Sequence, residues 1–316
     1  MMKMLTRNET AQFLLQYDHY VILTHRRPDG DTLGSAALLC RMLRKLGKTA
    51  HVLHNPETSA RLSWITESLE KQEVEESDCL ICVDVATDDI LPRAFQCYKD
   101  QITLRIDHHG SSTSFTELEY VEPGSASCAE ILYDLALELG VDLDRDMAEA
   151  LYVGISTDTG CFRFANTTGH TFRTAAACVE AGAQIHRLNQ ELFETNTLAR
   201  LKVQAWMIDH LKLLKEGTLA LAVIPRSVEL ELGATEEDMD NISSIPRTVA
   251  GVKVAVTLRE SPEGDVKLSV RAVPGYDAAA LAKQFGGGGH TGAAGAHIRM
   301  KLDQVCPMVE QALMEL

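Results

Sequence analysis

Four apolar, β-rich runs, each ending in an imidazole or a carboxylate, constrain the fold of this chain more than any other feature. The runs are YVILTH, TAHVLH, CLICVD and ITLRID, and an amphipathic segment from Thr32 to Leu46 separates the first two. Further helical patterns follow at residues 128–139, 146–156 and 170–181. This alternation predicts an α/β fold with a doubly wound, mainly parallel sheet. Strands in such a sheet are buried on both faces, which explains why the runs are continuously apolar.

The sequence pattern changes in the last third of the chain. Residues 188–216 contain neither Gly nor Pro, and we predict a connecting helix there. The runs TLALAVI, VKVAVTL and VKLSVRA then predict three strands, with a hairpin turn at ESPEGD between the last two. A helix over 277–284 and a strand near 294–300 complete the pattern. We therefore predict a first domain over residues 1–187 and a smaller α/β domain over residues 217–316.

Composition excludes several classes of protein. Of the 316 residues, 45% are hydrophobic and 24% are charged, which is ordinary for a globular chain and argues against disorder. The apolar runs are shorter than the ~18 residues that span a membrane, and the start of the chain lacks the apolar core of a signal peptide. We therefore expect a cytoplasmic protein without a membrane partner. The formal net charge of −15 argues against long nucleic acid as a partner, because such proteins carry a basic face.

Histidine and aspartate side chains follow the predicted strands and, in one case, a predicted helix. An α/β sheet binds its ligand at this position, outside the carboxyl ends of its strands. The candidate metal ligands are His25, Asp29, Asp31, Asp84, His108 and Asp158. Singly, each has a plainer interpretation, such as a surface histidine or a helix cap. Together, two imidazoles and four carboxylates without a thiolate favour a hard or borderline divalent cation, Mn²⁺ above Zn²⁺. A closed structural site is the alternative, but such sites tend toward tetrahedral sets of nitrogen and sulfur, so the pattern favours catalysis.

A run of four glycines precedes His290 in the second domain. Glycines can adopt positive φ and aim successive N–H groups at an anion, and His290 can then donate to a phosphate. The alternative is a flexible linker, which the neighbouring predicted helix and strand argue against. Arg271 in VKLSVRA and Arg247 in SIPRTVAG are either solvated surface residues or phosphate contacts, since a guanidinium can bind phosphate through two parallel hydrogen bonds.

Four segments resemble, in order, the four motifs of the DHH phosphoesterases: HRRPDGD, the strand-end Asp84, DHH at 107–109 and TDTGCFRF. The segment GGGGHTGAAG resembles the hallmark of the DHH-associated C-terminal domain. The resemblance covers nearly the whole chain and implies a cofactor of two manganese ions. It implies that one ion is held by His25, Asp29 and Asp84, and the other by Asp31, Asp84, His108 and Asp158.

The resemblance also implies roles beyond metal binding. Asp84 would bridge the two ions, Asp107 would orient a histidine, and His109 would face the substrate as a phosphate contact or general acid. The implied substrate-binding residues are Arg271, Gly287, Gly288 and His290, with a looser match for Arg247. Four carboxylates carry a charge of about −4, which balances two divalent ions that can activate water for an in-line displacement at phosphorus.

Among the DHH phosphoesterases, the resemblance is closest to the short members called nanoRNase or oligoribonuclease, which also act on adenosine 3′,5′-bisphosphate. We therefore predict a manganese-dependent phosphoesterase whose substrate is short RNA or a small nucleotide. Hydrolysis of a linear or cyclic dinucleotide such as pApA stays open, and so does a non-catalytic nucleotide-binding regulator. Recombination exonucleases carry further domains, and the related inorganic pyrophosphatases lack the glycine-run domain. The sequence leaves the oligomeric state open, a homodimer included.

Overall fold

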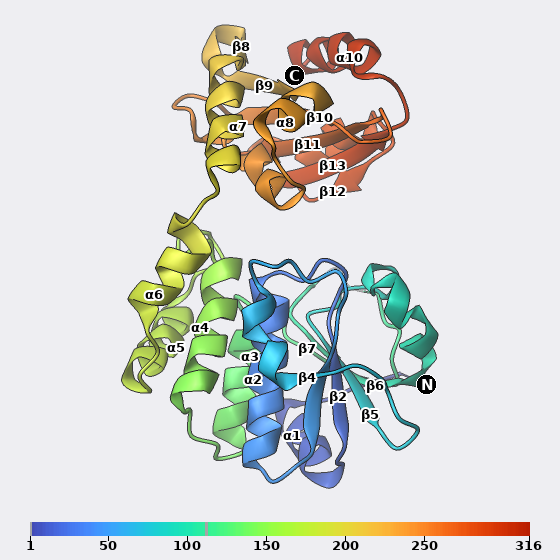
Figure 1. Cartoon of the computed structure of the whole chain (residues 1–316), viewed down its shortest axis with the longest axis vertical. Coiled ribbons are helices and arrows are strands. Elements are labelled where there is room, and N and C mark those ends of the chain that lie inside the picture. The colour runs from blue at the N-terminus through green and yellow to red at the C-terminus, as the bar shows by residue number, and fades with distance from the viewer. Residues whose placement is uncertain (1, 111–112) are drawn as a thin grey trace. The chain divides into compact units, whose positions relative to one another are not determined.

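The computed structural model describes residues 2–110 and 113–316, which form two compact units (Figure 1). The first unit comprises Met1–Thr195 and the second comprises Asn196–Leu316. Within the described residues, no helix is both long enough and apolar enough to cross a lipid bilayer.

A seven-stranded sheet forms the centre of the first unit. Its order is β1-β7-β6-β5-β2-β3-β4, and every neighbouring pair is parallel. The strands are β1 (Lys3–Met4), β2 (Tyr20–Leu23), β3 (Ala50–Leu53), β4 (Glu70–Lys71), β5 (Cys79–Val83), β6 (Ile102–Asp107) and β7 (Leu118–Val121). Because β6, β5 and β2 are adjacent and run in one direction, the loops that follow them meet at the same edge of the sheet. The predicted mainly parallel sheet is confirmed.

Both faces of this sheet are buried, and alternate residues of each strand point to opposite faces. In β2, Tyr20 and Ile22 join one apolar cluster, whereas Val21 and Leu23 join another. Helices cover the first face: α1 (Arg7–Gln16), α2 (Gly30–Lys45), α3 (Cys128–Glu138), α4 (Arg145–Asp158), α5 (Gly169–Glu180) and α6 (Ile185–Asn189). The 3₁₀ segments η3 (Asp88–Ile90) and η4 (Arg93–Gln101) and their connections cover the second face, where Phe95 joins the smaller cluster.

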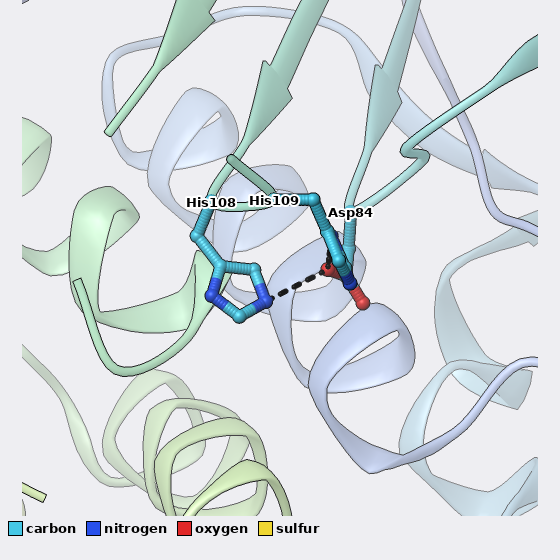
Figure 2. A group of neighbouring side chains, drawn as sticks. All are labelled: Asp84, His108 and His109. Atoms are coloured by element: carbon cyan, nitrogen blue, oxygen red, sulfur yellow. Dashed lines mark ion pairs between the residues drawn. The ribbon is translucent and has the colours of Figure 1, made fainter. Parts of the chain in front are cut away.

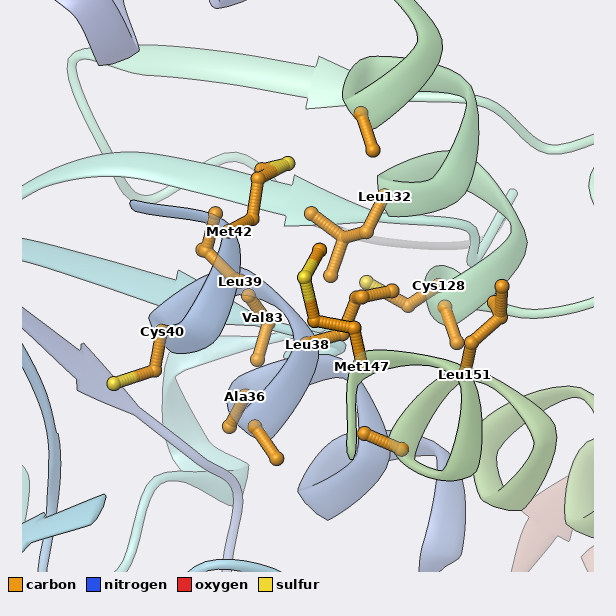
Figure 3. Packing of buried hydrophobic residues seen from close by; sticks show 14 of the residues in the cluster. Ala36, Leu38, Leu39, Cys40, Met42, Val83, Cys128, Leu132, Met147 and Leu151 are labelled. Atoms are coloured by element: carbon orange, nitrogen blue, oxygen red, sulfur yellow. The ribbon is translucent and has the colours of Figure 1, made fainter. Parts of the chain in front are cut away.

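The larger cluster brings α2, α3 and α4 together on the sheet (Figure 3). Leu38 of α2, Leu132 of α3 and Met147 of α4 pack within it. The backbones of α2 and α4 approach closely, because a Cβ atom on Gly34 would lie 2.5 Å from the carbonyl oxygen of Ala150. This contact fixes α4 against the helix that begins directly after the HRRPD loop.

The second unit contains a six-stranded sheet of order β12-β13-β11-β10-β9-β8, in which β9 and β10 pair in parallel and the other pairs are antiparallel. The strands are β8 (Lys212–Leu214), β9 (Leu219–Ile224), β10 (Val254–Glu260), β11 (Val266–Ala272), β12 (Gly288–Gly289) and β13 (Ala293–Ile298). The helices are α7 (Leu198–Asp209), α8 (Arg226–Leu232), α9 (Ala278–Lys283) and α10 (Leu302–Met314). The antiparallel pairing of β10 with β11 confirms the predicted hairpin.

The prediction of one connecting helix over residues 188–216 is wrong. After α6 the chain forms a π-helical turn over Gln190–Glu194, and the backbone is extended at Thr195. Helix α7 begins anew, because the Thr197 side chain accepts a hydrogen bond from the Arg200 N–H and caps it. Strand β8 then takes the last part of the range. A threonine cap thus interrupts the helical pattern without Gly or Pro.

Candidate metal centre

The carboxyl edge of the parallel sheet gathers all six predicted ligands. His25 follows β2, Asp29 caps α2, Asp31 lies in the first turn of α2, Asp84 follows β5, His108 follows β6 and Asp158 ends α4. Three groups among the described residues could hold a metal ion, and within each group one ligand atom per residue lies within 4.8 Å of the others. The groups are His25 with Asp29 and Asp84, Asp31 with His108 and Asp158, and Asp84 with His108 and His109.

The first group joins the loop after β2 to the end of β5. Nε2 of His25 lies 4.0 Å from Oδ1 of Asp29 and 3.9 Å from Oδ2 of Asp84. The Thr32 hydroxyl lies between the two carboxylates, 2.7 Å from Oδ2 of Asp84 and 3.2 Å from Oδ1 of Asp29, and its single proton can be donated to either oxygen. Sequence analysis missed Thr32, because a threonine in the first turn of a helix carries no signal of its own.

The second group surrounds His108. Its Nε2 atom lies 3.9 Å from Oδ2 of Asp31, 3.5 Å from Oδ1 of Asp84 and 3.4 Å from Oδ2 of Asp158. Figure 2 shows the imidazole directed at the Asp84 carboxylate. The two oxygens of Asp84 therefore face two different groups, Oδ2 toward His25 and Oδ1 toward His108.

Asp84 is buried, and the Thr32 hydroxyl compensates its charge only in part. Its Oδ1 atom accepts no hydrogen bond from the described residues, and its backbone has φ 58°, a left-handed conformation that costs a non-glycine residue about 1–2 kcal/mol. Burial, then the charges of Asp31 and Asp29, raises the pKa of Asp84 well above its ordinary value. Burial likewise raises the pKa of Asp158 to about 9. A buried carboxylate with a free oxygen is costly unless a cation pairs with it, so this donor set fits divalent metal.

The N-terminus of α3 holds Asp31 in place. Oδ2 of Asp31 accepts the Cys128 N–H at 2.7 Å, and Oδ1 accepts the Ala129 N–H at 3.0 Å. Helix α4 also approaches this carboxylate, since a Cβ atom on Gly154 would lie 2.8 Å from Oδ1 of Asp31 and 2.4 Å from Cβ of Ala129. Gly154 was not singled out from the sequence, although a glycine inside a helical pattern indicates close packing.

Asp107 orients His109 through a buried network. Oδ1 of Asp107 lies 2.8 Å from Nδ1 of His109 and also accepts the His108 N–H at 2.8 Å. Oδ2 of Asp107 lies 3.2 Å from Nη1 of Arg105, whose Nη2 is 2.7 Å from Oε2 of Glu119. Burial is the largest influence on Asp107 and raises its pKa, but the hydrogen bonds and charge of His109, together with the charge of Arg105, outweigh burial and lower the pKa of Asp107. The side-chain hydrogen bond with Asp107 raises the pKa of His109.

Backbone carbonyls orient the two candidate histidine ligands. Nδ1 of His25 lies 2.8 Å from the carbonyl oxygen of Arg26, and Nδ1 of His108 lies 3.4 Å from that of Ser125. A carbonyl can only accept a hydrogen bond, so each neutral ring carries its proton on Nδ1. The Nε2 lone pairs then point into the carboxylate cluster, as metal coordination requires.

In the second unit, two candidate arginines, Arg271 and Arg247, interact electrostatically. Burial, then the charge of Arg247, lowers the pKa of Arg271. Arg271 lies on β11 opposite Ala293 of β13, and the carbonyl of Ala293 accepts the His290 N–H at 2.8 Å. The sheet therefore places Arg271 beside the turn that carries His290, within the second unit.

The glycine run forms part of the sheet of the second unit and is not a linker. Gly288 and Gly289 form β12 and pair with β13, so the linker interpretation is excluded. The expectation that successive N–H groups of this run face an anion is wrong for Gly286 and Gly287, because their N–H groups donate to carbonyls of α9. Position 287 needs glycine for space, since a Cβ atom there would lie 2.1 Å from the carbonyl oxygen of Gly295.

Comparison with known proteins matches each unit to a domain family. Residues 19–155 match the DHH family, N-terminal domain, and residues 217–315 match the DHHA1 domain. The bifunctional oligoribonuclease and PAP phosphatase NrnA of Thermus thermophilus is 35% identical over 298 residues, which cover 93% of this chain and 89% of that protein. The protein of the same name from Bacillus subtilis is 26% identical over an alignment that covers 92% of this chain and 93% of that protein.

A solved structure shares the whole fold. The exopolyphosphatase-related protein from Bacteroides fragilis superposes with a TM-score of 0.89 over 98% of this chain and 96% of that chain. Its sequence is 23% identical, so this likeness speaks for the architecture of the chain and not for its substrate.

Proposed function

The chain belongs to the DHH family, and we propose that it is a phosphoesterase that hydrolyses short oligoribonucleotides to mononucleotides and adenosine 3′,5′-bisphosphate to AMP. The observation that carries this proposal is Asp84, whose buried carboxylate directs one oxygen to each of two ligand groups. The names of the relatives from Thermus thermophilus and Bacillus subtilis support both substrates.

We propose that the centre holds two divalent cations, with Mn²⁺ as the physiological metal. One cation would be held by His25, Asp29 and Asp84, and the other by Asp31, Asp84, His108 and Asp158. When bound, two such ions lower the pKa of water and stabilise the oxygens of an in-line displacement at phosphorus. The absence of a thiolate from the donor set supports Mn²⁺ over Zn²⁺.

His109 and Asp107 supply the proton transfer in this proposal. Asp107 holds Nδ1 of His109 at 2.8 Å and raises the pKa of the ring, so that a larger fraction is protonated at neutral pH. Nε2 of His109 then donates a proton to the leaving oxygen or a hydrogen bond to the phosphate. Arg105 keeps Asp107 ionised from the other side.

Binding of the nucleotide by the second unit is a proposal as well. Arg271, Gly288, His290 and, more loosely, Arg247 would contact its phosphates or bases, and Gly287 would provide the close approach of strands that shapes this surface. The charge of Arg247 lowers the pKa of Arg271, which supports a shared anionic ligand. A cytoplasmic location and a homodimer stay predictions, which cell fractionation and light scattering would test.

A substrate panel resolved by product size tests the proposed function. RNAs of 2 to about 24 nucleotides, pApA, a cyclic dinucleotide and adenosine 3′,5′-bisphosphate are incubated with Mn²⁺ or with chelator. We expect mononucleotides from the shortest RNAs, AMP from the bisphosphate, and no turnover with chelator. Activity restricted to dinucleotides would favour the dinucleotide phosphodiesterase, and nucleotide binding without any turnover would favour the regulator.

A further inference from the structure

A pocket of about 450 Å³ lies at the carboxyl edge of the parallel sheet, beside the candidate metal centre. Its lining includes Arg26, Arg27, Glu57, Asp89, Arg93 and Gln96. We call it the arginine pocket. Its volume falls in the range of roughly 300–1,000 Å³ that is usual for small-molecule sites. The described function leaves this pocket without a role.

The arginine pocket and the metal centre are built from the same two loops. The loop after β2 carries His25 and then Arg26, and the segment after β5 carries Asp84 and then Arg93. The Arg26 N–H donates to the carbonyl of Ile90 at 2.7 Å, which ties the two loops together. The Arg26 carbonyl faces Nδ1 of His25 at 2.8 Å. A ligand group in the pocket is therefore held by the same backbone that positions the centre.

The charge of the arginine pocket favours a single phosphate group. Arg26, Arg27 and Arg93 are exposed, and none of them forms an ion pair within residues 2–110 and 113–316. With Glu57 and Asp89 the lining carries three positive and two negative charges, although the whole chain carries −15. Asp89 is already engaged by the Thr87 hydroxyl. Free guanidinium groups at a pocket bind phosphate oxygens through charge-assisted hydrogen bonds, and a net charge near +1 suits one phosphate better than a polyanion.

The backbone supports a ligand-facing role for this loop. Arg27 adopts φ 46°, a left-handed conformation that an arginine adopts at a cost of about 1–2 kcal/mol. Gln96 donates to the carbonyls of Asp88 and Leu91 at 3.0 and 3.2 Å, which fixes the segment before Arg93. The guanidinium groups are thus presented by a constrained backbone, which lowers the entropic cost of binding.

We propose that the arginine pocket binds a second phosphate group of the substrate, distinct from the phosphate hydrolysed at the metal centre. This inference rests on the proposed function. The pocket would then determine substrate specificity. A nucleotide with phosphates at both the 3′ and 5′ positions is preferred over one with a 3′-phosphate alone. Because its net charge matches one phosphate, the pocket would also favour substrates with few phosphates.

The test compares adenosine 3′,5′-bisphosphate with adenosine 3′-monophosphate, which differ only in the 5′-phosphate. We measure kcat/KM for both substrates with Mn²⁺ in the wild type, Arg93→Gln and Arg26→Gln. The ratio of the two values should fall about 10- to 100-fold in either variant, as expected when one charged hydrogen-bonding group is lost. Arg145→Gln is the matched control, because Arg145 begins α4 at the end opposite Asp158, and its ratio should equal that of the wild type.

An unchanged ratio in Arg93→Gln and Arg26→Gln overturns the proposal, and so does an equal loss on both substrates, which would mean a general effect on the centre. Thermal unfolding of each variant separates misfolding from loss of a contact. If the wild type hydrolyses neither substrate, the proposed function has failed. The binding constants of the same two nucleotides, measured by calorimetry on metal-loaded protein, then give the same ratio without turnover.

Discussion

Oδ1 of Asp84 lies 3.5 Å from Nε2 of His108, and it accepts no hydrogen bond from the part of the chain that the structure describes. Two ligand atoms bound to one ion at about 2.1 Å lie about 3.0–3.4 Å apart at neighbouring positions, so this separation matches a shared cation better than a hydrogen bond. The fold thus buries a carboxylate oxygen that has no hydrogen-bond partner among the described residues, as the proposed metal centre requires.

Replacing Asp84 should have opposite effects on activity and on metal-free stability. Asp84→Asn removes the ligand shared by both groups, and we expect kcat to fall at least ~1,000-fold with loss of bound Mn²⁺. The raised pKa of Asp84 means that its ionisation destabilises the folded state above the unfolded pKa of about 4, so the metal-free variant should unfold several degrees higher than metal-free wild type. Metal analysis with a turnover assay tests the loss of Mn²⁺ and activity, and calorimetry tests the rise in unfolding temperature. A variant that keeps half of wild-type turnover contradicts the role of Asp84.

Metal binding should release protons. Asp158 has a pKa raised to about 9 in the metal-free protein, and Asp84 and Asp31 are shifted in the same direction. Coordination requires the ionised carboxylates, so apparent Mn²⁺ affinity should rise with pH between about 6 and 9. Calorimetric titration in buffers of different ionisation enthalpy counts the released protons. An affinity independent of pH over that range would refute this account of the carboxylates.

Gly154→Ala should damage the centre without touching a ligand. The added Cβ would meet Oδ1 of Asp31 at 2.8 Å and Cβ of Ala129 at 2.4 Å, so α4 must move away and carry Asp158 with it. We expect weaker Mn²⁺ binding and a loss of about 1–3 kcal/mol in the free energy of unfolding. The control is Gly140→Ala, since a Cβ on Gly140 meets nothing within 4 Å, although its φ of 65° costs some stability. Equal metal affinity in both variants would rule out the proposed packing effect.

Asp107→Asn should shift the pH dependence of turnover. The carboxylate of Asp107 raises the pKa of His109, and an amide cannot supply its charge. Protonated His109 is the active form of a general acid, so activity is lost as pH rises through its pKa. Lowering that pKa should therefore move the alkaline limb of the kcat profile to lower pH, and NMR titration of the ring should move with it. If the limb stays in place while the ring titration moves, another group is the acid.

Arg271→Gln should weaken nucleotide binding but leave the metal centre intact. Arg271 lies on β11 close to the turn that carries His290, and the charge of Arg247 lowers its pKa. Loss of one charged contact should raise KM for short RNA about 10- to 100-fold. The affinity for Mn²⁺, measured in the absence of nucleotide, should equal that of the wild type. A fall in metal affinity alongside KM would show that the substitution perturbs the fold instead.

The sequence indicated buried parallel strands because their residues are continuously apolar, and the two buried faces bear this out. It also indicated the six candidate ligands, because each lies in a segment that follows a predicted strand or helix. It did not indicate Thr32, Gly154 or the Arg105–Glu119 pair, although a charged residue inside the apolar run ITLRID was a signal that a buried partner existed.

Two expectations failed for related reasons. The connecting helix is broken by the Thr197 cap, and a threonine is compatible with both helix interior and helix start. The N–H groups of Gly286 and Gly287 donate to carbonyls of α9. No local sequence pattern shows whether a glycine N–H will donate to a carbonyl or to a ligand. In each case the choice depends on which partner the rest of the chain brings near.

The chain's own order of residues determined the alternation of strands and helices and the chemical types available at their ends, since these follow from local periodicity. Only the tertiary structure decided that one carboxylate faces two ligand groups, that α4 comes close enough to Asp31 to require Gly154, and that three arginines share a pocket with no ion pair among the described residues. These are relationships between segments far apart in sequence, and the close packing of the sheet and helices sets them.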